Sequence, residues 1–324
     1  MENRTPFVTA PSSVDRPFDM SWINAVLDRL AANPVCGYTL EGPPAVEPTS
    51  LAALGLLAHS RLREARPALN WLTDRQSADG SLGIDANHAS PQWPTPWALL
   101  AWQSALDAAE HTDLATTHVT RWRTSAKRAT HWALTARSTV NKKQDVIEHD
   151  QSLVAWCWVL GTHAWVEPTA MMLCALKATG RADHPRCREA VSLLLDRMLP
   201  NGGWNYGNTV VLGNVLRPHV QPTGLALTAL SGEALAEDYV VRSLQYLDEA
   251  IGKRTTTASL CYAMLGAGTH AHRLEDADSL LRAANQRTLH RDASPYRTAL
   301  VALAAASLRE TGENSNWRVG ERHE

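Results

Sequence analysis

The sequence predicts an all-α protein and, within that class, an α/α toroid (α6–α6 barrel) built as a single domain. The first reason is a repeat, because a helix rich in alanine and leucine begins six times along the chain. The second is that charged helices with one apolar stripe alternate with these apolar helices. Strand-like alternation of polar and apolar residues is nearly absent. Two kinds of helix in alternation predict two concentric rings, an apolar inner ring and an amphipathic outer one.

Six helix starts define the predicted inner ring. Most carry a proline in or beside the first turn, where its missing N–H leaves no hydrogen bond unmade. The helices that follow are apolar on nearly every side, which is typical of buried helices. The starts lie at Glu47, Thr95, Glu167, Gln221, Thr256 and Ser294.

The predicted outer ring consists of helices with one apolar and one charged face. Short connections make each helix antiparallel to the next, so the inner helices run parallel and begin at one mouth. Their dipoles make that mouth positive, which favours an anionic ligand group and lowers the pKa of Glu167. The outer helices are expected at about 20–33, 63–77, 117–137, 184–199, 237–252 and 275–288.

The predicted domain organisation has three parts. Residues 1–19 are expected to be a flexible N-terminal segment, and residues 312–324 a polar C-terminal tail. Residues 20–311 form the barrel domain. The longest gap between inner helices holds a tryptophan-rich insertion at about 138–166, and long insertions in compact domains are often functional.

Composition narrows the class of protein. The 324 residues carry a net charge of −2, which gives no reason to expect a nucleic-acid partner. No apolar run is long enough to span a bilayer, and the N-terminus lacks the apolar stretch of a signal peptide, so we expect no transmembrane segment and a cytoplasmic location. Five cysteines without CxxC spacing argue against a disulfide framework. The sequence leaves the oligomeric state open.

The densest group of reactive side chains lies at 148–167, directly before an inner helix. We expect acid–base chemistry from His149, Asp150 and Glu167, which become the candidate catalytic residues. Indole rings suit an apolar ligand or a carbocation. The alternative is a structural plug in which these side chains pack and cap. The segment supplies four candidate substrate-binding residues, Trp156, Trp158, His163 and Trp165.

The remaining candidate substrate-binding residues lie at other points of the expected mouth. Glutamate is a mediocre N-cap, so its presence at two equivalent helix starts points to a role beyond capping, although capping remains the simple alternative. We predict no cofactor. A zinc or magnesium site built from residues such as His149, Cys157 and His163 stays open, although no recognised ligand spacing supports it. The candidates at the mouth are Glu47, Trp97, Trp204, Tyr206, Gln221 and Tyr262.

Two turns resemble the QW-type turn of terpene cyclases and prenyltransferases, namely QSADGSLG at 76–83 and LPNGGWNY at 199–206. Their Asp-Gly and Asn-Gly pairs supply residues with positive φ. With the helix-pair repeats, the chain resembles a single-domain member of the prenyltransferase/squalene cyclase repeat superfamily that lacks the DxDD motif. In that resemblance Glu167 takes the place of the proton-donating aspartate, while Trp165 and Pro168 replace flanking aspartates.

The resemblance implies a terpene cyclase-like barrel that acts on or binds an apolar, isoprenoid-like small molecule in its central cavity. Acid–base chemistry would centre on Glu167, and the protein would be an enzyme of the isomerase or lyase type. Two alternatives remain at this point. One is a non-catalytic barrel that binds a ligand or a peptide, and the other is a divergent zinc-dependent prenyltransferase-like enzyme.

Overall fold

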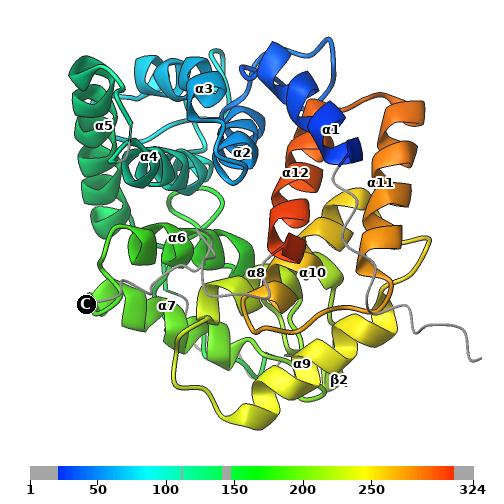
Figure 1. Cartoon of the computed structure of the whole chain (residues 1–324). Helices are drawn as coiled ribbons and strands as arrows, with labels where there is room; N and C mark the ends of the chain where they lie inside the picture. The colour runs from blue at the N-terminus through cyan, green and yellow to red at the C-terminus, as the bar shows by residue number, and fades with distance from the viewer. Residues whose placement is uncertain (1–20, 111, 141–146, 310–324) are drawn as a thin grey trace, which may run out of the picture.

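A computed structural model describes residues 21–110, 112–140 and 147–309, and these form an all-α toroid (Figure 1). Six helices surround the centre of the ring. Each inner helix packs on the next and the sixth packs on the first, which closes the ring. The inner helices are α2 (Val46–Leu57), α4 (Thr95–Ala109), α6 (Val166–Ala178), α8 (Val220–Leu230), α10 (Thr257–Gly268) and α12 (Pro295–Arg309).

The other six helices of the described residues lie outside this ring (Figure 1). They turn an apolar stripe inward, as the Leu193 and Leu194 pair of α7 does, and their charged faces lie outside. A short hairpin, β1 (Val210–Val211) and β2 (Asn214–Val215), precedes α8. The outer helices are α1 (Ser21–Ala32), α3 (Leu62–Arg75), α5 (Thr116–Thr135), α7 (Pro185–Asp196), α9 (Glu237–Ala250) and α11 (Ala277–Arg291).

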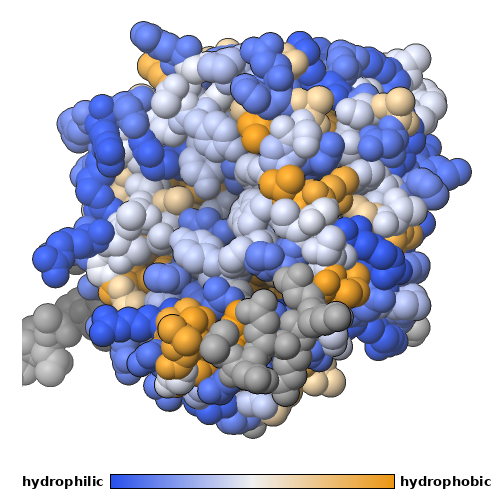
Figure 2. Space-filling view, turned by 180° about the vertical axis from the view of Figure 1, so that it is seen from behind, coloured by the Kyte–Doolittle hydropathy of each residue, from blue (hydrophilic) through white to orange (hydrophobic). Residues whose placement is uncertain are grey.

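The predicted fold class is confirmed, and the expected helix positions agree with the observed ones to within a few residues. The predicted flexible start and polar tail lie outside the described residues, as do residues 141–146 of the predicted insertion. In Figure 2 the opposite face of the molecule is mostly polar, with apolar surface in separate patches. None of the helices in the described part of the chain has the length and apolar character that crossing a membrane requires.

Small residues let the inner helices approach closely. Gly224 of α8 and Gly266 of α10 lie where the two backbones meet, and a Cβ on Gly224 would come within 2.2 Å of the Tyr262 carbonyl oxygen. The predicted turn glycines behave as expected, since Gly80 has a φ of 97° and Gly202 a φ of 89°. Each of these turns abuts the backbone of the following outer helix, at Arg128 and Arg242 respectively. Larger residues would therefore push α8 and α10 apart, and would move the two turns away from α5 and α9.

A repeated threonine fixes the start of four inner helices. Its buried hydroxyl accepts a hydrogen bond from the N–H, and donates one to the C=O, of a single residue in the preceding loop. We call this arrangement the threonine clamp. It ties the loop to the first turn of the helix, so the loop and the helix start lie at the same mouth. The clamped pairs are Thr49 with Cys36, Thr95 with Leu82, Thr169 with Trp156 and Thr223 with Trp204.

Candidate active site

The residue two positions before each clamp threonine faces the lumen. In α2, α6 and α8 these residues are Glu47, Glu167 and Gln221, and before α4 the residue is Trp93. Tyr296 holds the same position relative to Thr298 in α12. All five line one pocket of about 230 Å³ at the mouth formed by the helix N-termini. The rest of its wall comes from Tyr38, Trp158, Met171, Leu225 and Tyr262.

Glu47 lies in the first turn of α2, with 8% of its surface exposed. The Tyr38 hydroxyl donates to its Oε2 at 2.6 Å. Burial raises the pKa of the Glu47 carboxyl to about 7, against the lowering effect of the Tyr38 hydrogen bond. The negative charge of Glu167 raises this pKa further. Glu47 is therefore a carboxyl that can hold a proton near neutral pH.

Glu167 occupies the equivalent place in α6 and is 4% exposed. The Gln221 side-chain amide donates to its Oε1 at 3.0 Å and lowers its pKa, but burial is the larger effect and raises the pKa to about 7. The expectation that the helix dipole would lower this pKa is wrong. Removing the carboxylate from water outweighs the favourable field of one helix end.

The two carboxyls share one protonation equilibrium. The charge of Glu167 acts on Glu47, so the pair takes up its two protons one after the other, in steps that belong to the pair and not to either residue. The Tyr38 hydroxyl occupies Oε2 of Glu47, and the Gln221 amide occupies Oε1 of Glu167. Each carboxyl thus keeps one oxygen for a ligand. A protonated acid and a carboxylate in one pocket is a pairing suited to general acid–base catalysis.

Aromatic rings form the walls around the carboxyls. Trp93 and Trp158 meet edge to face with ring centres 5.1 Å apart. On another side Tyr38 packs on Tyr296, with centres 5.4 Å apart. The Tyr262 and Tyr296 hydroxyls form a hydrogen bond, and burial raises the pKa of both phenols, so they stay neutral donors and acceptors. Aromatic walls with a few placed polar groups are typical of small-molecule sites.

The structure brings five of the predicted site residues into this pocket, namely Glu47, Trp158, Glu167, Gln221 and Tyr262. Two others lie at its borders. Trp97 sits deeper in the lumen beside Tyr262, with ring centres 6.2 Å apart. Tyr206 is half exposed and packs on His219, and the Glu167 charge helps to raise the pKa of its phenol.

Two predicted tryptophans pack in the core instead. Trp156 is 3% exposed, donates to the Ala133 carbonyl oxygen at 3.0 Å, and lies under the Arg186 guanidinium at 4.1 Å. Trp204 is 1% exposed and donates to the Leu194 carbonyl oxygen. The burial of both indole rings follows from the threonine clamp, because the clamped residue turns its side chain toward the outer ring. The residue two positions later in the loop, Trp158 in one copy, faces the mouth.

His149 and Asp150 do not join the carboxyl pair. His149 lines a separate pocket of about 220 Å³ with His163 and Arg197. Burial lowers the pKa of His149 to about 4, and the Arg197 charge acts in the same direction. Asp150 is exposed and accepts hydrogen bonds from the Ser152 N–H and hydroxyl.

The remaining predicted residues of the tryptophan-rich segment are His163, which lines this second pocket, and Trp165 beside it. The rings of His163 and Trp165 pack with centres 4.5 Å apart. Within the described residues, no three His, Cys, Asp or Glu side chains come together as a metal site.

Sequence reasoning missed Tyr38, Trp93, Met171, Leu225 and Tyr296 as residues of one pocket. A signal for Trp93 was present, because WPT at 93–95 matches EPT at 47–49 and 167–169. Aligning on the threonine instead of on the helix start would have placed Trp93 beside the glutamates. The same alignment marks Tyr38, because matching VEPT at 46–49 with VEPT at 166–169 places Tyr38 opposite Trp158.

No protein-family model matches the sequence, and no curated protein matches it significantly. Solved structures do match. An α-amylase from Clostridium perfringens shares 8% identity with a TM-score of 0.57, over 89% of this chain and 97% of that one. A reducing-end-xylose releasing exo-oligoxylanase shares 10% identity with a TM-score of 0.54, over 93% of this chain and 94% of that one. A protein from Actinoplanes shares 15% identity with a TM-score of 0.54, over 89% of this chain and 100% of that one. At these identities the likeness shows a shared fold.

These matches correct the family prediction. The assignment to the prenyltransferase/squalene cyclase repeat superfamily is wrong, because the α-amylase, the exo-oligoxylanase and a further structure named a glycosidase match this toroid. The QW-like turns misled because they are structural devices, in which a positive-φ glycine lets a turn abut an outer helix. The prediction of an isoprenoid-like ligand and of a terpene cyclase-like isomerase or lyase is wrong for the same reason. The mouth itself is lined by carboxyl, hydroxyl and amide groups.

Proposed function

We propose that the protein is a glycoside hydrolase, with Glu47 as general acid and Glu167 as general base. One observation carries this proposal. Two buried carboxyls with pKa values raised to about 7 face one pocket whose walls are aromatic rings and phenol hydroxyls. A carboxylic acid and a carboxylate on either side of the scissile bond are the usual machinery of glycoside hydrolysis. The glycosidase activities named for structures of the same fold support it.

The proposal gives the two carboxyls opposite protonation states at the start of the reaction. Protonated Glu47 gives its proton to the glycosidic oxygen as the bond from that oxygen to the anomeric carbon breaks. A water molecule adds to the anomeric carbon and gives its proton to Glu167. The products are a free sugar and an alcohol, and proton exchange with solvent restores the pair. Single displacement by water inverts the configuration at the anomeric carbon.

Hydrogen bonds from neighbouring groups position the two carboxyls. Tyr38 fixes Glu47 through Oε2, so the acidic proton is carried by the other oxygen. Gln221 donates to Oε1 of Glu167 and stabilises its ionised form. Trp93 and Trp158 offer ring faces and edges to the C–H surface of a sugar, while the tyrosine hydroxyls can bind sugar hydroxyls.

The test is a panel of 4-nitrophenyl glycosides of common hexoses and pentoses in both anomeric forms, together with xylo- and malto-oligosaccharides. We expect the wild-type protein to hydrolyse at least one member. The Glu47→Gln and Glu167→Gln variants should each hydrolyse the oligosaccharide that the wild-type protein cleaves best at least about 100-fold more slowly than the wild type does. Glu64→Gln, a change on the exposed face of α3, is the matched control and should leave the rate unchanged.

Failure of the wild-type protein to hydrolyse any glycoside would overturn the proposal. Equal rates for wild type and Glu167→Gln would do so as well. Proton NMR of the sugar first released identifies the nucleophile. Inverted configuration at the anomeric carbon indicates attack by water, whereas retained configuration would indicate direct attack by Glu167.

All five cysteines are buried and free, which supports a reducing compartment, and the cytoplasmic location stays a prediction.

A further inference from the structure

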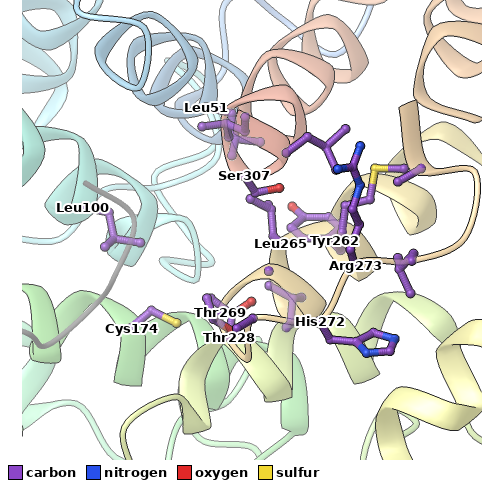
Figure 3. A pocket seen from close by; sticks show the side chains of 18 of the residues that line it. Leu51, Leu100, Cys174, Thr228, Tyr262, Leu265, Thr269, His272, Arg273 and Ser307 are labelled. Atoms are coloured by element: carbon purple, nitrogen blue, oxygen red, sulfur yellow. The ribbon is translucent and has the colours of Figure 1, made fainter. Parts of the chain in front are cut away.

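A second hollow lies deeper in the lumen, toward the C-terminal ends of the inner helices (Figure 3). Its volume is about 240 Å³. We call it the inner chamber. An apolar cavity of about 150 Å³ is large enough to bind benzene in another protein, so the inner chamber has room for a substantial apolar group. Its wall includes Leu51, Leu100, Cys174, Leu265 and Leu303.

The inner chamber and the carboxyl pocket share a wall. Met171, Leu225 and Tyr262 line both hollows, so a single layer of side chains lies between them. The methionine in this layer has a flexible unbranched side chain, which can change rotamer at low cost. The two hollows are therefore neighbouring compartments of one lumen, polar at the mouth and apolar beyond.

One polar group in the inner chamber has no partner. Trp97 lines the chamber, is 5% exposed, and its indole N–H makes no hydrogen bond within the described residues. A buried donor without a partner costs free energy. Its ring lies against Tyr262, at the boundary with the carboxyl pocket. The indole nitrogen is covered by its neighbours in this structure, so a ligand oxygen would satisfy it only after side chains at this boundary move.

We infer that the substrates are glycosides whose aglycone is apolar, an alkyl or aryl group, and that the inner chamber binds this aglycone. The inference rests on the proposed glycosidase function. The sugar occupies the mouth beside Glu47 and Glu167, and the aglycone extends past Met171 into the lumen. The leaving alcohol then remains beside Glu47, which protonates it. His272 and Arg273, from the connection between α10 and α11, lie at the far rim of the chamber (Figure 3).

The experiment compares the methyl and octyl glycosides of one sugar, each below its critical micelle concentration. Burying two methylene groups is worth about tenfold in affinity, so we expect kcat/KM for the octyl glycoside to exceed that for the methyl glycoside at least about tenfold. Cys174→Phe fills the chamber and should lower this ratio at least about tenfold, whereas Cys174→Ala keeps the space and should preserve it. Thr228→Phe fills the same hollow from α8 and replaces Cys174→Phe if that variant does not fold.

The outcomes separate this inference from the proposed function. If both glycosides are hydrolysed at equal rates, the inner chamber does not bind the aglycone, while the proposed function stands. If no glycoside of the panel is hydrolysed, the proposed function fails, and calorimetric binding of the methyl and octyl glycosides decides the chamber alone. Tighter binding of the octyl glycoside than of the methyl glycoside, with this difference lost in Cys174→Phe, would support binding of the aglycone in the inner chamber. Equal binding of the two ligands, or octyl binding unaffected by Cys174→Phe, would overturn it.

Discussion

The segments at 36–49 and 156–169 carry the two carboxyls and are built alike. Each ends in Val-Glu-Pro-Thr, and in each the threonine clamps a residue 13 positions earlier. The backbone N–H of each valine also bonds a carbonyl oxygen of the next loop along the ring, of Ile84 in one case and Tyr206 in the other. Two copies of one local structure thus place two glutamates at equivalent points of the mouth.

The copies differ in what meets each carboxyl. Glu47 is bonded by Tyr38 from its own segment, whereas the equivalent loop residue near Glu167 is Trp158, and Gln221 of the next inner helix supplies the hydrogen bond instead. Local sequence therefore fixes where each carboxyl lies, and the hydrogen-bond donor differs between the copies. The proposed function gives Glu47 the role of the acid and Glu167 that of the base. Changes made in both copies test that division of roles.

The largest expected difference concerns the leaving group. On an alkyl glycoside, Glu47→Gln and Glu167→Gln should each lower kcat/KM by about 10²–10⁴. On a 4-nitrophenyl glycoside, whose leaving group needs no protonation, Glu47→Gln should recover most of the wild-type rate and Glu167→Gln should not. Steady-state kinetics on the two substrates measure this. Recovery in Glu167→Gln instead would exchange the assigned roles.

The next prediction tests whether the threonine clamps of the two copies are equally stabilising. Thr49→Val and Thr169→Val each leave a buried backbone N–H without its partner, at Cys36 and Trp156 respectively. Each should lower the free energy of unfolding by about 1–3 kcal/mol, and the two losses should be similar. Urea unfolding measures them, with Thr49→Ser and Thr169→Ser as controls that keep the hydroxyl. A loss in only one copy would show that the clamps are not equivalent.

A smaller effect concerns stability and pH. Both carboxyls have folded-state pKa values of about 7, above the ordinary value of 4.5, so their neutral forms favour the folded state. That contribution is fully present below about pH 4.5 and is lost as the pH rises through about 7. Glu47→Gln and Glu167→Gln should therefore stabilise the protein at pH 8, on the order of 1 kcal/mol each, and have no such effect at pH 4.5.

The double variant that carries both Glu47→Gln and Glu167→Gln tests whether the two carboxyls interact. Repulsion between two ionised carboxyls disappears when either one is replaced, so the gain at pH 8 should be less than the sum of the single gains. Thermal melting at the two pH values measures it. Additive gains would show that the carboxyls do not interact.

The smallest effects are shifts of the pH–rate profile. Tyr38 lowers the pKa of Glu47, so Tyr38→Phe should move the alkaline limb, which reports loss of the Glu47 proton, to higher pH. Gln221 lowers the pKa of Glu167, so Gln221→Met should move the acidic limb to higher pH. The kcat/KM profiles of the two variants should therefore differ in which limb moves. Movement of the same limb in both would contradict the assignment.

The architecture was readable from the sequence because its signals are local. Proline beside most helix starts, apolar inner helices and amphipathic outer helices are all patterns within a few residues, and they predicted the two rings and the place of Glu47 and Glu167 at the mouth. The tryptophan-rich segment shows the limit of such signals. It was expected to work as one loop, but the clamp on Trp156 turns that ring into the core and leaves Trp158 at the mouth.

The rest depended on contacts between distant segments. Tyr38 and Tyr296 are 258 positions apart yet pack on each other, and no local pattern announces this. The raised pKa of Glu167 depends on burial by neighbouring helices, which the dipole argument did not include. The chemistry was misjudged because turns typical of a toroid report the fold and not the reaction.

The most direct test of the carboxyl pair is a titration by NMR of protein labelled with ¹³C at the glutamate side-chain carboxyl carbon. The signals of Glu47 and Glu167 are assigned by their loss in the two glutamine variants. We predict that both titrate near pH 7 and that the midpoint of Glu47 falls when Glu167 is replaced by glutamine. Titration of both carboxyls near their ordinary value of 4.5, each unaffected by replacement of the other, would contradict the account.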